Sequence, residues 1–294
     1  MDQALRAIHD WRSRGRWIDA HGRAVFAVDE GDGRRCAVLL HGFPGSSFDW
    51  RRVIPLLSPH ARVVAFDFLG FGLSDKPLEG AYAVSDQADL TERLLKSLGV
   101  ERCLLVGQDL GETVAAELLR RVHDGRLGVD VEAMILLGGA VLAEPRELPS
   151  GQRLLLSMPD EPLPMPLPLE VLLPDLSAAF SREHQPSRED LEAMLWLVGH
   201  REGDRLLPRL IRHVEERRRA GDRWTAALLA FAGPLAVVWG EQDPLAGPGL
   251  SALLEELRPE TAVLPWPDVG HWPALEVPDR LGEAILDRLE RLQI

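Results

Sequence analysis

The chain has 294 residues, of which 46% are hydrophobic and 27% are charged. This length and composition exclude a peptide hormone, a small disulfide scaffold and a disordered chain, and they allow one large core that carries an insertion. Acidic residues outnumber basic residues by 46 to 33, so the formal net charge is −13. A negative charge of this size disfavours nucleic acid and anionic membranes as partners.

The N-terminus and the cysteines bear on the cellular compartment. No run approaches the ~20 apolar residues that span a bilayer, and residues 1–17 lack the apolar region of a signal peptide. We therefore expect a cytoplasmic protein. Cys36 and Cys103 each begin an apolar run, which is typical of small buried thiols rather than of a disulfide or a metal site.

The elements predicted along the chain alternate between strands and helices. After a segment that fits a short helix, two strand-like stretches flank His21 and Gly22 and predict a hairpin. Apolar runs then predict strands buried on both faces at 36–40, 62–66, 103–107, 133–137, 234–239 and 262–266, with helices at 85–98 and 111–123. This order predicts an α/β fold with a mostly parallel, eight-stranded sheet flanked by helices.

One interval between the predicted strands is much longer than the others. It begins with a proline-rich stretch and continues with helical patterns at 187–199 and 207–219, the first opened by a capping-box sequence at Ser187. We interpret the basic run Arg217-Arg218-Arg219 as the solvated C-terminus of a helix. The predicted division of the chain is a core of residues 1–143 and 227–294 with an inserted helical cap of residues 144–226.

Three residues at predicted strand ends form a candidate catalytic triad. Asp109, in Gly107-Gln108-Asp109-Leu110-Gly111, lies where a buried strand runs directly into a helix, which is the setting of a nucleophile elbow. The pattern is weak on its own because many loops satisfy it. Asp243 follows the first strand after the insertion and His271 follows the last strand, so the chain order is nucleophile, acid, histidine.

A further motif fits the same edge of the sheet. His41-Gly42-Phe43-Pro44-Gly45 follows the predicted strand 36–40. The backbone amides of Phe43 and Leu110 are placed to form an oxyanion hole, the pair of donors that stabilises a negatively charged intermediate. No cofactor or metal site is predicted.

At these motifs the sequence resembles the α/β-hydrolase superfamily, in the branch of epoxide hydrolases and haloalkane dehalogenases with an aspartate nucleophile. Within it, the nearest resemblance is to the mesoderm-specific transcript proteins and their bacterial relatives. It covers the chain from about residue 16 onward and rests on 41–50 (HGFPGSSFDW), 66–77 (FDFLGFGLSDKP), the elbow through 115–119 (AAELL), and Arg223-Trp224 in the predicted cap. The resemblance implies that Asp109 is the nucleophile, His271 the base and Asp243 the acid, with oxyanion amides from Phe43 and Leu110.

An aspartate nucleophile restricts the reaction. A carboxylate with a pKa of ~3.9 is ionised at neutral pH and attacks without a base. Attack on an ester carbonyl would give a high-energy anhydride, whereas attack on a saturated carbon gives a stable alkyl ester. A water activated by His271 then hydrolyses that ester. The predicted reaction is therefore hydrolytic displacement at carbon.

The residue that stabilises the leaving group is not evident from the sequence. Leu110 occupies the position where many relatives carry a halide-binding tryptophan, and the one tyrosine, Tyr82, lies outside the predicted cap. Trp196 and His200 share a helix face because they are four residues apart. Ordinary packing explains the tryptophans equally well. The candidate donors in the cap are Trp196, His200, His213 and Trp224, of which Trp196, His200 and Trp224 are the predicted substrate-binding residues.

Three functions remain open from the sequence. The first is a hydrolase of the epoxide-hydrolase type that acts on a small apolar substrate, the second a haloalkane dehalogenase, and the third a non-catalytic ligand-binding protein on a hydrolase fold. Glu144 is an alternative to Asp243 as the triad acid, because some relatives place the acid there. The expected partner is a small-molecule substrate. The sequence leaves the oligomeric state open, with a homo-oligomer as one alternative.

Overall fold

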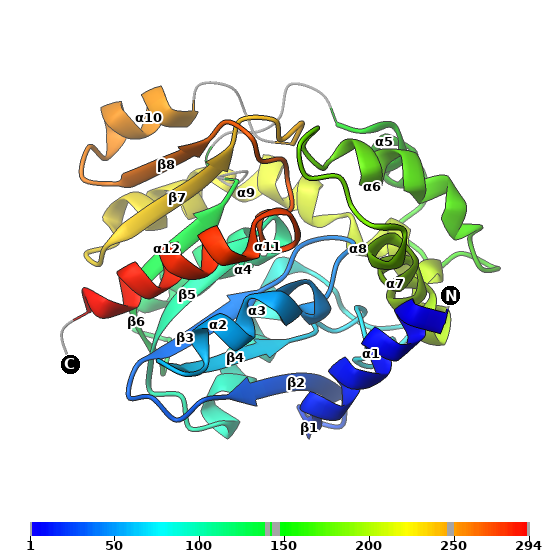
Figure 1. Ribbon diagram of the computed structural model, residues 1–294, viewed down its shortest axis with the longest axis horizontal. Helices are drawn as coiled ribbons and strands as arrows, with labels where there is room; N and C mark the ends of the chain where they lie inside the picture. Colours follow the sequence, from blue (N-terminus) through cyan, green and yellow to red (C-terminus); the bar gives the residue numbers. More distant parts are fainter. Residues whose placement is uncertain (1, 139–141, 143–147, 246–249, 293–294) are drawn as a thin grey trace.

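The computed structural model describes residues 2–138, 142, 148–245 and 250–292. Its centre is an eight-stranded sheet with the order β1-β2-β4-β3-β5-β6-β7-β8 (Figure 1). The strands are β1 (Arg16–Asp19), β2 (Ala24–Glu30), β3 (Cys36–Leu40), β4 (Arg62–Phe66), β5 (Arg102–Gln108), β6 (Asp130–Leu137), β7 (Leu235–Gly240) and β8 (Ala262–Trp266). The predicted fold class is thus confirmed, and each predicted apolar run is a strand. β8, however, is an edge strand with Leu264 and Pro265 exposed, so the prediction that it is buried on both faces is wrong.

The sheet is antiparallel at one edge and parallel elsewhere. β2 pairs antiparallel with both β1 and β4, while the strands from β4 to β8 in the sheet order run parallel. The predicted hairpin turns at His21 and Gly22, whose φ angles are 57° and 77°. In the parallel part, Leu40 of β3 pairs with Gly107 of β5, so the segments that follow these two strands emerge side by side.

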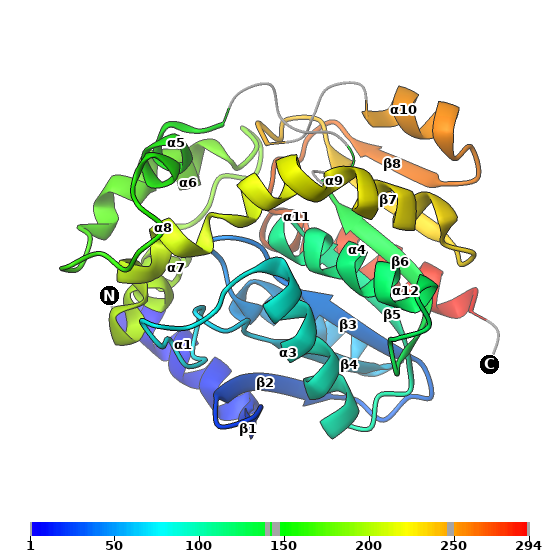
Figure 2. The ribbon, with the colours of Figure 1, turned by 180° about the vertical axis from the view of Figure 1, so that it is seen from behind.

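Helices cover both faces of the sheet. α2 and α12 lie on the face seen in Figure 1, and α3 and α4 lie on the face seen in Figure 2. Successive residues of β3 point to opposite faces, as the pleat of a strand requires, so Val38 and Ala37 belong to separate hydrophobic clusters. The helices of this part of the chain are α1 (Asp2–Arg14), the 3-10 helix η1 (Ser47–Arg52), α2 (Ile54–Leu57), α3 (Val84–Ser97), α4 (Leu110–His123), α10 (Leu250–Leu257), α11 (Pro273–Glu276) and α12 (Pro278–Glu290).

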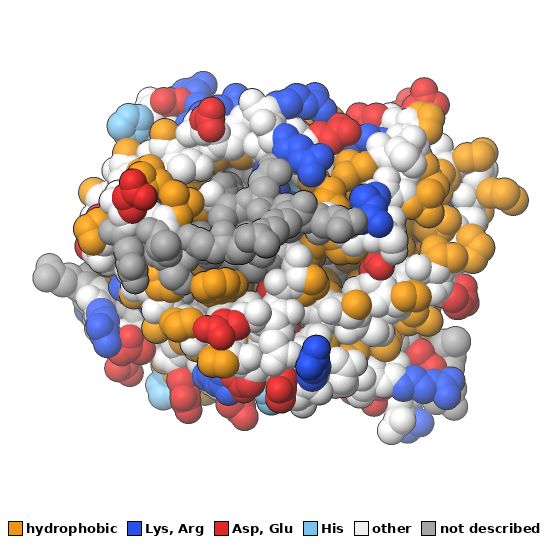
Figure 3. Space-filling model, turned by 90° about the horizontal axis from the view of Figure 1, so that it is seen from above, with side chains coloured by type: hydrophobic (Ala, Val, Ile, Leu, Met, Phe, Trp, Pro, Cys, Tyr) orange, Lys and Arg blue, Asp and Glu red, His pale blue; other side chains and the backbone are white. Residues whose placement is uncertain are grey.

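The long interval between β6 and β7 is largely helical. Ser187 caps α7 as predicted, because its side chain accepts a hydrogen bond from the Asp190 amide at 3.0 Å. Figure 3 shows the molecule from above, with hydrophobic side chains gathered over the inserted helices, where Leu154 and Val171 are exposed. The elements are α5 (Ser150–Ser157), η2 (Leu169–Leu172), α6 (Leu173–Ala178), α7 (Arg188–Gly199), η3 (His200–Leu206), α8 (Leu207–Leu210) and α9 (His213–Ala230).

The second predicted helix of this interval needs correction. Instead of one helix at 207–219, the chain forms the short α8 and then α9, which continues to Ala230. Arg217 therefore lies inside α9 rather than at a helix C-terminus, and it is buried rather than solvated. α9 packs along α4, the helix that follows Asp109 (Figure 2).

Both cysteines are free thiols buried in the core, as the sequence indicates. Burial raises the pKa of Cys36 to about 12, so its thiol stays protonated. Within the described residues, no helix combines the length and the apolar character needed to cross a membrane.

Candidate active site

Asp109 occupies a strained turn between β5 and α4. Its φ and ψ angles are 48° and −107°, an uncommon backbone conformation for a residue other than glycine. The flanking glycines are required by close packing. A Cβ on Gly107 would lie 2.7 Å from the carbonyl oxygen of Gly111, and one on Gly111 would lie 2.3 Å from that of Leu40. The sequence pattern of the elbow is thus explained by backbone contacts.

The carboxylate of Asp109 is buried and contacts a donor at each oxygen. Oδ2 accepts a hydrogen bond from the Phe43 amide at 3.0 Å. Oδ1 lies 3.1 Å from Nη1 of Arg217 and 3.6 Å from Nε2 of His213. Burial alone would raise the pKa of Asp109, but the neighbouring His213, Arg217 and His271 hold it well below its usual range. Asp109 is therefore ionised in the resting protein.

His271 and Asp243 lie within hydrogen-bonding distance of each other. Nδ1 of His271 is 2.9 Å from Oδ2 of Asp243, and Oδ1 of Asp243 accepts a hydrogen bond from the Leu245 amide at 2.7 Å. Burial lowers the pKa of His271, but the charges of Asp243 and Asp109 outweigh this and raise it to about 9. Nε2 of His271 is buried and has no hydrogen-bond partner among the described residues, so it is available to a water or a substrate.

The loop that carries His271 is fixed from several sides. Its carbonyl oxygen accepts a hydrogen bond from Nε2 of Gln108, and its amide donates to the carbonyl of Ala179, both at 2.7 Å. The carboxylate of Glu276 accepts from the amides of Gly270 and Trp272, each at 2.9 Å. None of these supporting contacts is predictable from the sequence motifs alone.

The loop after β3 brings the Phe43 amide to the carboxylate of Asp109. Nε2 of His41 accepts from the Phe68 amide at 3.0 Å, so Nδ1 carries the proton and donates to the Gly42 carbonyl at 2.8 Å. A Cβ on Gly42 would lie 2.9 Å from the Cβ of Asp109, so the close approach needs glycine. Leu110 is the first residue of α4, where backbone amides lack an intrahelical partner. The Phe43 amide thus lies at Asp109, and the oxyanion role of the Phe43 and Leu110 amides stays a prediction.

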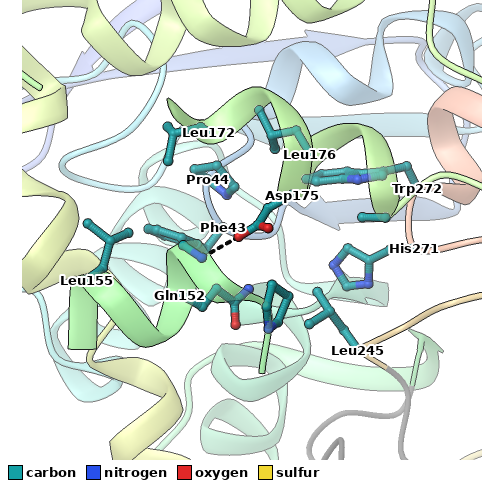
Figure 4. A pocket seen from close by; sticks show the side chains of 13 residues that line it. Phe43, Pro44, Gln152, Leu155, Leu172, Asp175, Leu176, Leu245, His271 and Trp272 are labelled. Carbon is teal, nitrogen blue, oxygen red and sulfur yellow. Dashed lines mark hydrogen bonds between the residues drawn. The ribbon is translucent and has the colours of Figure 1, made fainter. Parts of the chain in front are cut away.

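A mostly apolar cavity of about 40 Å³ is bordered by Phe43 and His271, whereas Asp109, His213 and Arg217 are not among its lining residues (Figure 4). His271 and Trp272 border one side, and residues of the inserted helices α5 and α6 border the other. The lining residues are Phe43, Pro44, Pro149, Gly151, Gln152, Leu155, Leu172, Asp175, Leu176, Ala179, Leu245, His271 and Trp272. Across the described ranges, no group of three or more His, Cys, Asp or Glu side chains could hold a metal ion.

The predicted substrate-binding residues lie elsewhere. Nε1 of Trp224 donates to the carboxylate of Glu117 on α4 at 3.0 Å, which ties α9 to the core. Trp196 and His200 do share a helix face, and their rings stack at 4.7 Å between centroids, but Trp196 packs against the cluster that contains α1. None of the three lines the cavity, and none is among the described residues that hydrogen-bond or pair with the carboxylate of Asp109. This placement gives no support to their predicted role.

The residues of the inserted segment that contact the carboxylate of Asp109 are His213 and Arg217. His213 was one of the candidate donors, whereas Arg217 was misinterpreted as solvated. A signal for both was present in the sequence. Position 217 lies four residues after position 213, and position 224 lies eleven residues after it. This spacing puts the three positions on one face of a helix. Glu144, the alternative acid, lies outside the described residues.

Comparison with known proteins identifies the family of this chain. Residues 38–278 match the family model described as the alpha/beta hydrolase fold. The chain belongs to this family. The protein is accordingly a hydrolase, as the sequence resemblance implied.

Three similar proteins illustrate the relationship. The hydrolase is 36% identical to "Putative hydrolase LipZ" of Mycobacterium tuberculosis, over 96% of this chain and 98% of the relative. It is 32% identical to the mesoderm-specific transcript homolog protein of Bos taurus, over 94% and 86% of the two chains. The structure of a loop variant of the haloalkane dehalogenase DbeA-M1 from Bradyrhizobium elkanii superposes with a TM-score of 0.77 at 22% identity, over 94% of this chain and 96% of that one. The predicted resemblance is thus confirmed.

Proposed function

We propose that the protein is a hydrolase of the epoxide-hydrolase type, which displaces a leaving group at carbon through an alkyl ester on Asp109. The observation that carries the proposal is the ionised carboxylate of Asp109, held at a strained elbow with Oδ2 on the Phe43 amide. A serine in this position would need a base for its attack, but a carboxylate does not. The reaction that suits a carboxylate is attack on a saturated carbon.

The first step forms the ester. Oδ1 of Asp109 attacks the electrophilic carbon, while Oδ2 stays on the Phe43 amide. The bond between that carbon and its leaving atom breaks, and the electron pair goes to the leaving atom. With an epoxide, the leaving oxygen stays in the same molecule as an alkoxide and takes up a proton. With a haloalkane, the halide departs with the electron pair.

The second step hydrolyses the ester and requires the histidine. Nε2 of His271 removes a proton from water, and the resulting hydroxide attacks the carboxyl carbon of Asp109. The negative charge then develops on Oδ2, where the amides of Phe43 and Leu110 stabilise it. The bond from this carbon to Oδ1 breaks, and the product alcohol leaves with the proton from His271. Asp243 orients His271 and stabilises its positive charge.

The cavity supports a small, mostly apolar substrate. Leucine, proline and aromatic side chains dominate its lining, and Gln152 and Asp175 are its polar members apart from His271 and the indole of Trp272. We propose that the inserted segment, predicted as residues 144–226, is the cap that selects this substrate, since α5 and α6 contribute much of the lining.

A haloalkane dehalogenase is the second candidate. It is favoured by one observation, the guanidinium of Arg217 at Asp109, because a permanent cation can hold a departing halide. An epoxide hydrolase is the first candidate because His213 can supply the proton that an epoxide oxygen requires. His213 lies beside the same oxygen of Asp109.

Trapping the ester tests the mechanism. The variant His271→Ala should form the ester but fail to hydrolyse it, because alkylation needs no base. After incubation with butene oxide or butyl bromide, intact-protein mass spectrometry should show a substrate-sized adduct on the peptide that contains Asp109. The variant Asp109→Asn should show none.

Isotope labelling separates the covalent route from direct attack by water. In a single turnover in water labelled with heavy oxygen, the wild-type protein should incorporate the label into Asp109, since water attacks the ester carbonyl. A different result would contradict the covalent route: the wild-type protein turns the substrate over with label only in the product, and His271→Ala forms no adduct. Asp109 would then act as a base that activates water. Saturable binding of both probes without adduct or turnover would favour the non-catalytic alternative.

A further inference from the structure

α9 brings two basic side chains to the attacking oxygen of Asp109. His213 and Arg217 are four residues apart on one face of the helix, and their side chains are 2% and 8% exposed. Both contact Oδ1, the oxygen that the Phe43 amide leaves free. The carboxylate of Asp109 therefore faces a guanidinium and an imidazole ring that both come from α9.

The contacts of His213 fix the orientation of its ring. Nδ1 lies 2.9 Å from the carbonyl oxygen of Leu210, which can only accept a hydrogen bond, so Nδ1 carries a hydrogen. Nε2 is then the ring nitrogen that faces the carboxylate of Asp109, at 3.6 Å from Oδ1. Gain or loss of a proton at Nε2 leaves the bond from Nδ1 to Leu210 intact.

The charge of Arg217 needs a counter-ion throughout the reaction. Its partners among the described residues are Oδ1 of Asp109 at 3.1 Å and Oγ1 of Thr113 at 3.5 Å. When Asp109 becomes a neutral ester, the guanidinium loses the negative charge of its partner. A buried cation without a counter-ion is strongly unfavourable. The anion that the same step creates is the leaving atom, so its formation beside Arg217 restores the charge balance.

We propose that Arg217 and His213 form the leaving-group site of this protein, which rests on the function proposed above. Arg217 transfers its hydrogen bonding from Oδ1 to the leaving atom as negative charge develops there. Nε2 of His213 donates its proton to an epoxide oxygen, which becomes the hydroxyl of the alkyl-enzyme. His213 regains the proton from the carboxylic acid that ester hydrolysis leaves on Asp109. The substrate class is an electrophile with an oxygen leaving atom that requires a proton.

The test measures ester formation alone, in the His271→Ala background, with probes that differ in the leaving atom. Butene oxide needs a proton to complete ring opening, whereas butyl bromide does not. Adding His213→Gln should slow alkylation by butene oxide about a hundredfold. It should leave alkylation by butyl bromide within about threefold. Adding Arg217→Gln should slow alkylation by both probes, and Arg217→Lys should restore part of the rate because it keeps the charge.

Arg219→Gln is the matched control, since this exposed arginine of α9 pairs with Glu215 and not with Asp109. It should change neither rate. Thermal unfolding of each variant shows whether the fold is retained. Equal slowing of both probes by His213→Gln would overturn the proton transfer. Faster alkylation in Arg217→Gln would show that Arg217 restrains the nucleophile and would overturn its role at the leaving atom.

The two proposals fail in different ways. If unmodified His271→Ala forms no adduct with either probe, the covalent mechanism fails and the leaving-group site fails with it. If that variant forms the adducts but His213→Gln and Arg217→Gln form them at unchanged rates, the covalent mechanism stands. In that case the leaving-group site is wrong.

Discussion

Nη1 of Arg217 lies 3.1 Å from Oδ1 of Asp109. This ion pair joins α9, the last of the inserted helices, to the elbow of the core. The carboxylate of Asp109 also raises the pKa of His271. One negative charge therefore stabilises cations on both sides of the site, and the formation of an ester on Asp109 removes it from both.

The loss of this charge predicts the pH dependence of ester hydrolysis. His271 must be neutral to accept a proton from water, but in the free protein the charges of Asp243 and Asp109 raise its pKa to about 9 against the effect of burial. Ester formation removes the contribution of Asp109. The rate of adduct hydrolysis should therefore rise with pH, with a midpoint below 9.

Single-turnover hydrolysis of the wild-type adduct, followed by mass spectrometry across the neutral and alkaline range, measures this midpoint. Titration of His271 in the free protein by NMR provides the reference. A midpoint in the adduct at or above the pKa of the free protein would contradict the electrostatic coupling of Asp109 and His271.

The same residue predicts how stability varies with pH. The pKa of His271 is raised by folding from 6.5 to about 9. The folded protein therefore binds the proton more tightly than the unfolded chain, so this contribution is fully present below pH 6.5 and is lost as the pH rises through about 9. A rise of this size in the pKa of His271 corresponds to about 3 kcal/mol in the free energy of unfolding.

The double variant Asp243→Asn/His271→Gln removes both charges of the pair and serves as the reference. Urea unfolding at a series of pH values should show that the wild-type protein loses about 3 kcal/mol relative to the double variant as the pH rises through this interval. Parallel pH profiles for the two proteins would refute the prediction.

Replacement of Asp243 should separate the two chemical steps. In Asp243→Asn, the adduct should still form, because the carboxylate of Asp109 attacks without a base. Its hydrolysis should slow by roughly 10³ to 10⁴, since the charge that orients and stabilises protonated His271 is lost. Glu144→Gln is the comparison, and it should hydrolyse the adduct at close to the wild-type rate. The reverse pattern would assign the role of the acid to Glu144.

The fold was predictable because its strands have a strong local signal. Strands buried on both faces appear as short apolar runs, and β3 and β4 begin and end at the predicted residues. The edge strand β8 also has the predicted bounds, although Leu264 and Pro265 are exposed. The extent of α9 was not predictable from its first residues. Its polar face gives no indication that the helix continues along α4 beyond residue 219.

The site was only partly predictable for a related reason. Asp109, Asp243 and His271 follow strands of one parallel sheet, so strand order alone brings them to the same edge. No such rule orients the inserted helices. Trp196 and His200 were correctly assigned to one helix face, but the sequence does not state what that face contacts. Arg217 was misjudged because a run of three arginines is usually solvated, whereas this one includes a buried counter-ion of Asp109.

The placement of Trp224 gives a final prediction, which distinguishes packing from substrate binding. Its indole donates to Oε2 of Glu117, a nearly buried carboxylate that also binds Arg120 and Arg121. Trp224→Phe keeps an aromatic ring in this position but removes the donor, so the free energy of unfolding should fall by about 1 to 3 kcal/mol. Alkylation of Asp109 by butene oxide in the His271→Ala background should stay within about twofold of the unmodified background, because loss of one donor leaves Arg217 and His213 in place. Urea unfolding and adduct formation measured on the same preparation give both quantities. Unchanged stability together with a large loss of alkylation would contradict the packing role and would support substrate binding by Trp224.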